Sequence, residues 1–349
     1  MAQQLTERSQ KILEIIIEEY IASAQPVGSK AITQNEAISL SSASVRNVMA
    51  DLEEQGYLIS PHTSAGRIPT EKGYRFYVDT LLRITDLDRQ QKDQIEQHYH
   101  HHGLQMADML RDASRALSSV SHYTGLVMVP RLNSTIFRQM EFVKLSAHQV
   151  LAVFITQSGL VQNRLIRLDE ELTSRELEQI TNYLNQSMSG LSIQEAQAQI
   201  VAEMAQEKAL YDQLLQRAFT LSSQALADQA SGDVIIEGAS HFLEQPEFTD
   251  FERMKGIVQT FEQKNTLIAL LDRSQQTEGV QVMIGSETEH SEFADCSLIT
   301  AAYSGKSGHL GSLGVIGPSR MPYSTIIPIV DYTANLITRL LDDEQETGD

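Results

Sequence analysis

One short stretch of serine, arginine and asparagine is better suited than any other part of this sequence to contact a nucleic acid. The stretch also carries apolar residues at helical spacing, namely Val45, Val48, Met49 and Leu52. At 100° per residue, Ala43, Arg46 and Asn47 project from the opposite side of such a helix. Arginine can bridge O6 and N7 of guanine and asparagine can pair with adenine, while Ser42 and Ser44 near the helix N-terminus suit phosphates. The pattern predicts a helix that reads DNA bases.

The neighbouring elements would position this helix within residues 1–83. A first helix begins after Thr6, a short second helix begins at Ser29, and the third begins after Ser41 or Ser42 and closes at Gly56. Residues 57–59 and 67–69 then fit two short strands around a polar turn, and Thr70 caps a further helix. This order, within about 70 residues, is typical of a winged helix-turn-helix.

The residues expected to contact DNA come from the second helix, the third helix and the wing. Arg67, in the wing, is expected to meet phosphate or the minor groove. The full expected set is Ser29, Lys30, Ser42, Ala43, Ser44, Arg46, Asn47, Thr63 and Arg67.

Three other candidates for chemistry carry less weight. His98 and His100–His102 are the densest group of metal-type ligands, but consecutive histidines on a helix diverge by about 100° and cannot converge on one ion. Gly305-Lys306-Ser307 imitates the end of a phosphate-binding loop, but a strand rather than a helix is expected to follow it. Cys296 has no paired histidine motif. We therefore expect no enzyme activity, no metal and no cofactor.

Charge is distributed unevenly along the 349 residues. The net charge is −19, yet residues 1–83 carry 8 basic and 10 acidic side chains, which leaves −17 for the rest. Residues 60–83 carry 4 basic and 2 acidic side chains, and local charge decides phosphate attraction over a Debye length of about 10 Å. We expect modest DNA affinity for one chain and a need for dimerisation.

The chain has no signal-peptide core at its start, and its longest apolar runs are about six residues, far short of a membrane span of about 20. A single cysteine suits a reducing compartment. These features predict a cytoplasmic protein with no membrane partner.

The rest of the chain alternates between helical and strand periods. We expect a linker helix over 84–122, strands within 124–168, helices from 173 to about 230, a helix over 251–264, strands at 280–286, 297–303 and 311–316, and a last helix over 323–341. This order predicts an α+β multidomain protein. One α+β domain would comprise 123–169 and 251–349, interrupted by a largely helical insertion at 170–250.

Several long motifs carry a family resemblance. They include Pro-Val-Gly-Ser-Lys (26–30), Ser-Ser-Ala-Ser-Val-Arg-Asn-Val-Met-Ala-Asp-Leu-Glu (41–53), Pro-His-Thr-Ser-Ala-Gly-Arg-Ile-Pro-Thr (61–70), Gly-Tyr-Arg-Phe-Tyr-Val-Asp (73–79) and Gly-Val-Ile-Gly-Pro-Ser-Arg-Met-Pro-Tyr (314–323). The chain resembles the heat-inducible transcription repressor HrcA family, with mild departures at Ser319 and Pro322. The resemblance implies a GAF-like domain with an inserted dimerisation domain. It also implies a homodimer that represses class I heat-shock operons through a CIRCE-type inverted-repeat operator and depends on the GroEL chaperonin.

Two alternatives remain on the sequence alone. A GAF-like domain could instead sense a small molecule, which convergent polar groups in a pocket or a ligand-induced rise in melting temperature would favour. An enzyme fused to a DNA-binding module is disfavoured, because no nucleophile motif and no catalytic pair of carboxylates is evident.

Overall fold

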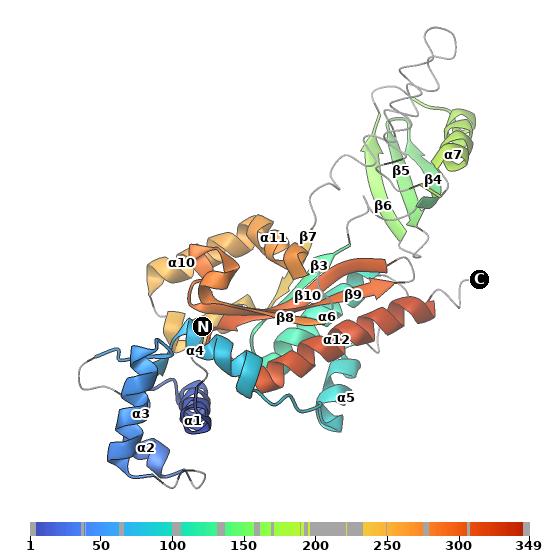
Figure 1. The fold of residues 1–349 in the computed structure, drawn as a ribbon. Helices are drawn as coiled ribbons and strands as arrows, with labels where there is room; N and C mark the ends of the chain where they lie inside the picture. Colours follow the sequence, from blue (N-terminus) through green and yellow to red (C-terminus); the bar gives the residue numbers. More distant parts are fainter. Residues whose placement is uncertain are drawn as a thin grey trace.

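The computed structural model describes residues 5–35, 38, 40–62, 66–99, 106–130, 137–156, 161–168, 171–188, 190–191, 195, 221, 233–248, 250–274, 279–305 and 308–344. They form a mixed α/β protein with three parts (Figure 1). We call residues 5–83 the N-terminal module, the five-stranded sheet with its helices the body, and the three-stranded sheet with its helix the outer unit.

The N-terminal module has the elements expected from the sequence, in the expected order. They are α1 (Glu7–Ser23), α2 (Ser29–Thr33), α3 (Ser42–Glu54), β1 (Leu58–Ile59), β2 (Ile68–Pro69), α4 (Glu71–Phe76) and the π-helical turn η1 (Tyr77–Leu81). The helix α1 begins where Thr6 Oγ1 accepts a hydrogen bond from Ser9 N, and it ends at Ala24 with a left-handed φ of 53°. Ile12, Leu13, Ile16 and Ile17 of its apolar stripe are fully buried, whereas Tyr20 and Ile21 at its end are partly buried.

The body is a sheet covered on both faces. Its elements are α5 (Arg89–Gln97), α6 (Met106–Ser121), β3 (Thr124–Val129), β7 (Asp233–Glu237), η3 (Ala239–Glu244), η4 (Pro246–Phe248), α10 (Phe251–Gln263), α11 (Asn265–Ser274), β8 (Val280–Ile284), η5 (Gly285–Thr288), η6 (Ser291–Phe293), β9 (Cys296–Gly305), β10 (Gly308–Pro318) and α12 (Tyr323–Glu344). The strand order is β7-β3-β10-β9-β8, and every pair is antiparallel. The helices α6 and α12 cover one face, and α10 and α11 lie over the other (Figure 1).

The side chains of β3 point alternately to the two faces of the sheet, so this strand contributes residues to two apolar clusters. Val127 packs into the cluster that contains α6 and α12, whereas Leu126 and Met128 pack into the cluster that contains α10 and α11. Strands buried on both faces are apolar without a break, as the Gly-Leu-Val-Met-Val run is. The cluster with α6 and α12 also continues into the N-terminal module, so the module and the body share one apolar core.

The outer unit departs from the expected division of the chain. We expected the strands of 124–168 to share a sheet with those after 280, but only β3 does so. The strands β4 (Phe137–Ser146), β5 (Gln149–Thr156) and β6 (Val161–Arg167) form a separate sheet. Met140, Val150 and Phe154 pack beneath α7 (Ser174–Met188) in a core of their own. The period of two predicts a strand but not its partner, which explains the difference.

Two further expectations differ from the structure. Residues 233–237 fall within the expected insertion at 170–250, where no strand was predicted, but they form β7, which pairs with β3 at the edge of the body sheet. Residues 84–122 were expected to be one linker helix. They contain α5 and α6, and α6 is a core helix with Leu110, Ala113 and Leu117 fully buried. Most of 189–232, the remainder of the expected helical insertion, lies outside the described residues.

Candidate nucleic-acid interface

The helix α3 has one buried face and one exposed polar face. Ser41, one of the two expected caps, has extended backbone angles, and its Oγ accepts a hydrogen bond from Ser44 N at 3.2 Å. The four apolar residues predicted to face the core are all buried. Ala43, Arg46 and Asn47 are exposed on the other side. The local sequence therefore presents an arginine and an asparagine together near the start of one helix.

A serine pair ties α2 to the start of α3. Ser29 Oγ and Ser42 Oγ lie 3.0 Å apart, and Arg46 Nε donates to Ser29 Oγ at 3.2 Å. Ser29 is buried, so its side chain lies inside the helix junction. Arg46 is held across the two helices by Nε alone, and its terminal nitrogens bond no other described residue. Lys30, on α2, is exposed.

Arg67, expected to meet phosphate or the minor groove, has hydrogen-bond partners within the protein. Its Nε donates to Glu53 Oε2 at 2.9 Å and its Nη1 donates to Ser60 Oγ at 3.3 Å. Its backbone pairs with Val27 in both directions at 2.9 Å. The guanidinium therefore joins the end of α3 to the hairpin of β1 and β2. Sequence reasoning missed Glu53 as the partner because 14 residues separate the two. Thr63, also expected at DNA, lies outside the described residues.

A glycine allows this close approach of the hairpin to the start of α2. A Cβ at Gly66 would lie 2.4 Å from both the carbonyl carbon and oxygen of Val27. Any side chain there would push the hairpin from the α1–α2 connection, because backbone atoms cannot give way.

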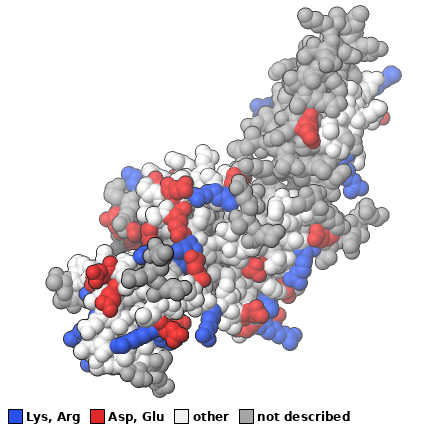
Figure 2. All heavy atoms as spheres, viewed as in Figure 1, with Lys and Arg blue, Asp and Glu red and all other residues white. Residues whose placement is uncertain are grey.

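Basic and acidic side chains are interspersed over the visible face of the N-terminal module, at the lower left of Figure 2, without one continuous basic patch. This agrees with the near-balanced charge of residues 1–83. Contacts by individual side chains, rather than a broad positive field, would have to hold a nucleic acid here.

The N-terminal module is fixed to the body by charged and polar contacts that the sequence did not reveal. Arg75 donates from Nε to Glu287 Oε1 at 2.8 Å and from Nη2 to the carbonyl of Val282 at 2.6 Å. Glu71 accepts from Ser286 N at 3.0 Å and from its hydroxyl. We call these contacts the α4 latch. Burial alone would raise the pKa of Glu287, but the hydrogen bonds from Arg75 and from Ile284 N outweigh it and lower that pKa.

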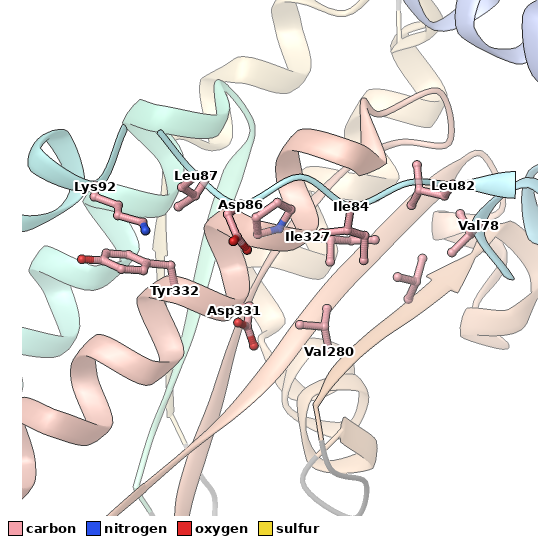
Figure 3. A pocket seen from close by; sticks show the side chains of 12 residues that line it. Val78, Leu82, Ile84, Asp86, Leu87, Lys92, Val280, Ile327, Asp331 and Tyr332 are labelled. Atoms are coloured by element: carbon pink, nitrogen blue, oxygen red, sulfur yellow. The ribbon is translucent and has the colours of Figure 1, made fainter. Parts of the chain in front are cut away.

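Behind the latch, the chain leaving the module crosses a groove of about 470 Å³ on the body. Figure 3 shows Val78 and Leu82 at one end and Lys92 with Tyr332 at the other. Lys92 Nζ lies 5.6 Å from the centre of the Tyr332 ring. Ile84 on the rim is 58% exposed. The groove is apolar with a polar end, and its outer wall is the connecting segment itself.

The candidates set aside on sequence have ordinary structural surroundings where they are described. His98 Nε2 lies 2.9 Å from Ser119 Oγ, and His100–His102 lie outside the described residues. Within the described part of the chain, no group of His, Cys, Asp and Glu could hold a metal ion. Burial raises the pKa of the Cys296 thiol. The strands β9 and β10 form an antiparallel pair around Gly305 and Gly308, so no helix follows the Gly-Lys-Ser sequence. No helix among the described residues is long and apolar enough to span a membrane.

These features define a multidomain α/β protein whose small N-terminal module presents a polar helix face. Residues 107–327 match the family model for the HrcA protein C-terminal domain. The heat-inducible transcription repressor HrcA of Geobacter sulfurreducens is 51% identical over 97% of this chain and 99% of its own. That of Syntrophobacter fumaroxidans is 39% identical over 98% and 99%. The chain belongs to the HrcA family of heat-inducible transcription repressors.

A solved structure titled as a hypothetical protein at 2.2 Å resolution is similar in fold, with a TM-score of 0.67 and 23% identity over 97% of this chain and 99% of that one. The relatives are named as transcription repressors rather than enzymes, which favours a regulatory role.

The α4 latch yields a prediction about how firmly the module is attached. Arg75→Gln and Glu287→Gln should each weaken the attachment by on the order of 1 kcal/mol, since both side chains are about one-third exposed. Hydrogen exchange of the full chain should show faster exchange in α4 and η1. Asp79→Asn is the matched control, because it removes only the exposed second partner of Arg75 and should change little.

The same pair should respond to acid. The pKa of Glu287 is lowered from its ordinary value of 4.5 in the folded protein. The stabilising contribution of Glu287 to the attachment is therefore complete above pH 4.5 and is lost as the pH falls through this lowered pKa. Equal rates of hydrogen exchange in α4 and η1 of the wild type and of Glu287→Gln at neutral pH would contradict a stabilising role of this pair.

Proposed function

We propose that the N-terminal module is a winged helix-turn-helix that binds an operator, and that α3 is its recognition helix. The observation that carries this proposal is the exposed Arg46–Asn47 pair at the start of α3, held by the Ser29–Ser42 contact. The N-terminal residues of a recognition helix are those that reach base edges in the major groove. Membership of a repressor family supports the same assignment.

The finer features implied by the family are proposed on the same basis. The operator would be a CIRCE-type inverted repeat at class I heat-shock operons, and a two-fold operator requires a two-fold protein. A homodimer would be formed by the inserted domain, and the body would be GAF-like. The protein would act in the cytoplasm as a non-enzymatic repressor. The part of the chain after residue 83, with −17 of the total charge, disfavours extensive wrapping of DNA and supports a need for two modules.

Base reading by α3 can be tested with a footprint on an inverted-repeat operator. Arg46→Ala should cost about 1–3 kcal/mol of operator binding and relax base preference, because a bidentate contact is lost. Arg46→Lys keeps the charge and should still lose preference. Arg111→Ala, which removes an exposed arginine of α6 in the body, is the control. Wild-type binding by Arg46→Ala would exclude α3 as the reader.

Two possible roles of Arg67, positioning of the wing and direct contact with phosphate, predict different results for the same variants. We propose that Arg67 positions the wing through Glu53. In that case Arg67→Ala and Glu53→Ala should both lower operator affinity, and neither should change the slope of affinity against salt. If Arg67 instead contacts phosphate, Glu53→Ala should raise operator affinity, because it removes a carboxylate that competes for the guanidinium. Arg67→Ala should then reduce the slope of affinity against salt concentration by the amount that about one phosphate contact contributes. Titrations at several salt concentrations decide between the two.

Dependence on the GroEL chaperonin is proposed as the source of heat response. A marginally stable repressor would lose its active form on heating, and chaperonin occupied by damaged proteins would restore less of it. After a mild heat step, operator binding should recover only in part on cooling and recover further with GroEL and ATP. Full recovery without chaperonin would argue against this mechanism.

A further inference from the structure

Ser29, one of the residues expected to contact DNA, lies inside the junction of α2 and α3. Its side chain is only 9% exposed. Its hydroxyl lies next to Ser42, at the start of α3, and next to Arg46, one turn further along the same helix. A side chain enclosed in this way can act on a DNA base through these two neighbours more readily than by itself.

Hydrogen-bond chemistry gives these contacts a direction. Arg46 Nε carries a proton and can only donate, so Ser29 Oγ accepts from it at 3.2 Å. The proton of a buried hydroxyl also needs an acceptor. In the described part of the chain, the acceptor in contact with the Ser29 hydroxyl is Ser42 Oγ, at 3.0 Å. The bonds therefore run from Arg46 to Ser29 and from Ser29 to Ser42, with Ser29 as the middle member.

This order leaves one edge of the Arg46 guanidinium available. A planar guanidinium has two edges that carry a pair of N–H groups, one formed by Nε with a terminal nitrogen and the other by the two terminal nitrogens. Ser29 occupies the first edge, and Nη1 and Nη2 bond to no other residue that the structure describes. Since Arg46 is exposed, the second edge is free to meet a ligand at the end of the side chain.

The free edge of Arg46 matches one base. Guanine presents two neighbouring acceptors in the major groove, O6 and N7, whereas adenine presents an acceptor beside a donor, thymine one acceptor beside a methyl group, and cytosine a donor. The two terminal nitrogens of a guanidinium therefore pair fully only with guanine. A guanidinium that is not held at Nε is free to turn toward a phosphate, and such a contact carries no sequence information.

We propose that Ser29 is a positioning residue that sets the base specificity of α3. It holds Arg46 by Nε, so that Nη1 and Nη2 together meet O6 and N7 of a guanine, and it does not contact DNA itself. This inference rests on the proposed function, because α3 must be the recognition helix. It adds which edge of Arg46 reads the base and which residue of α2 fixes that edge.

The bond between Arg46 and Ser29 can be measured without DNA, by nuclear magnetic resonance on the full chain with isotopically labelled arginine. The Arg46 Nε proton should exchange with water about fivefold faster in Ser29→Ala than in the wild type, because one hydrogen bond is lost. The signal is identified by its absence in Arg46→Lys. Thr33→Ala is the matched control, since it removes a hydroxyl of α2 that bonds to the Lys30 carbonyl. Equal exchange in the wild type and Ser29→Ala would overturn the proposal.

Base reading is measured on an inverted-repeat operator in which each guanine in turn is replaced by 7-deazaguanine, which lacks the N7 acceptor. At one position of the half-site, the replacement should weaken wild-type binding by about tenfold and Ser29→Ala binding by about threefold or less. Affinity for a scrambled duplex should differ by less than about twofold between the two proteins, because no phosphate contact is removed. An equal loss on the scrambled duplex would show that Ser29 contacts phosphate directly, against the proposal.

A double-mutant cycle separates positioning from a general effect of Ser29 on folding. If Ser29 acts through Arg46, Ser29→Ala should lower operator affinity in the wild-type background and change it little in the Arg46→Ala background. Additive losses would show a purely structural role and exclude positioning. A wild-type protein that binds the operator and the scrambled duplex equally would contradict the proposed function, and the role of Ser29 with it. Wild-type specificity that Ser29→Ala leaves unchanged would contradict the role of Ser29 alone.

Discussion

The attachment of the N-terminal module to the body is the constraint on which the rest of this structure depends. One apolar cluster runs from α1 and α3 through Tyr74 and Tyr323 to α12 and the body sheet. Burial of that surface supplies the non-directional part of the attachment. The α4 latch supplies direction, since a bidentate arginine and a carboxylate fix an angle as well as a distance. A module held in this way presents α3 at a set orientation.

A set orientation matters because the charge of the protein does little to hold DNA. The body carries most of the −19 charge, and the module itself is nearly balanced. DNA binding would therefore depend on a few side chains, each positioned by a hydrogen bond within the protein. Arg46 is held by Ser29, and the hairpin is held by Arg67 on Glu53. In both cases a hydrogen bond within the protein limits the rotamers available before DNA arrives, which lowers the entropy lost on binding.

Local features could be predicted from the sequence, and long-range ones could not. The cap at Ser41, the buried face of α3 and its exposed Arg46 follow from spacing within a dozen residues. The partners of Arg67 and Arg75 do not, because Glu287 lies 212 residues beyond Arg75.

Long-range pairing also explains why the assignment of strands to the two sheets could not be predicted. Alternation over 137–167 predicted strands correctly, but nothing local distinguishes a strand of the body from one of the outer unit. Residues 84–122 are charged and rich in glutamine, which predicted a linker helix, yet α6 within this segment buries Asp112 and Ser114 together with its apolar face.

The most direct test of the central claim is a mobility-shift titration of the full chain on three duplexes: an inverted-repeat operator, the same operator with one half-site scrambled, and a fully scrambled control. We expect a specific complex with two chains on the intact operator, much weaker binding to the single half-site, and only salt-sensitive binding to the scrambled duplex. Equal affinity for all three duplexes at physiological salt would contradict it.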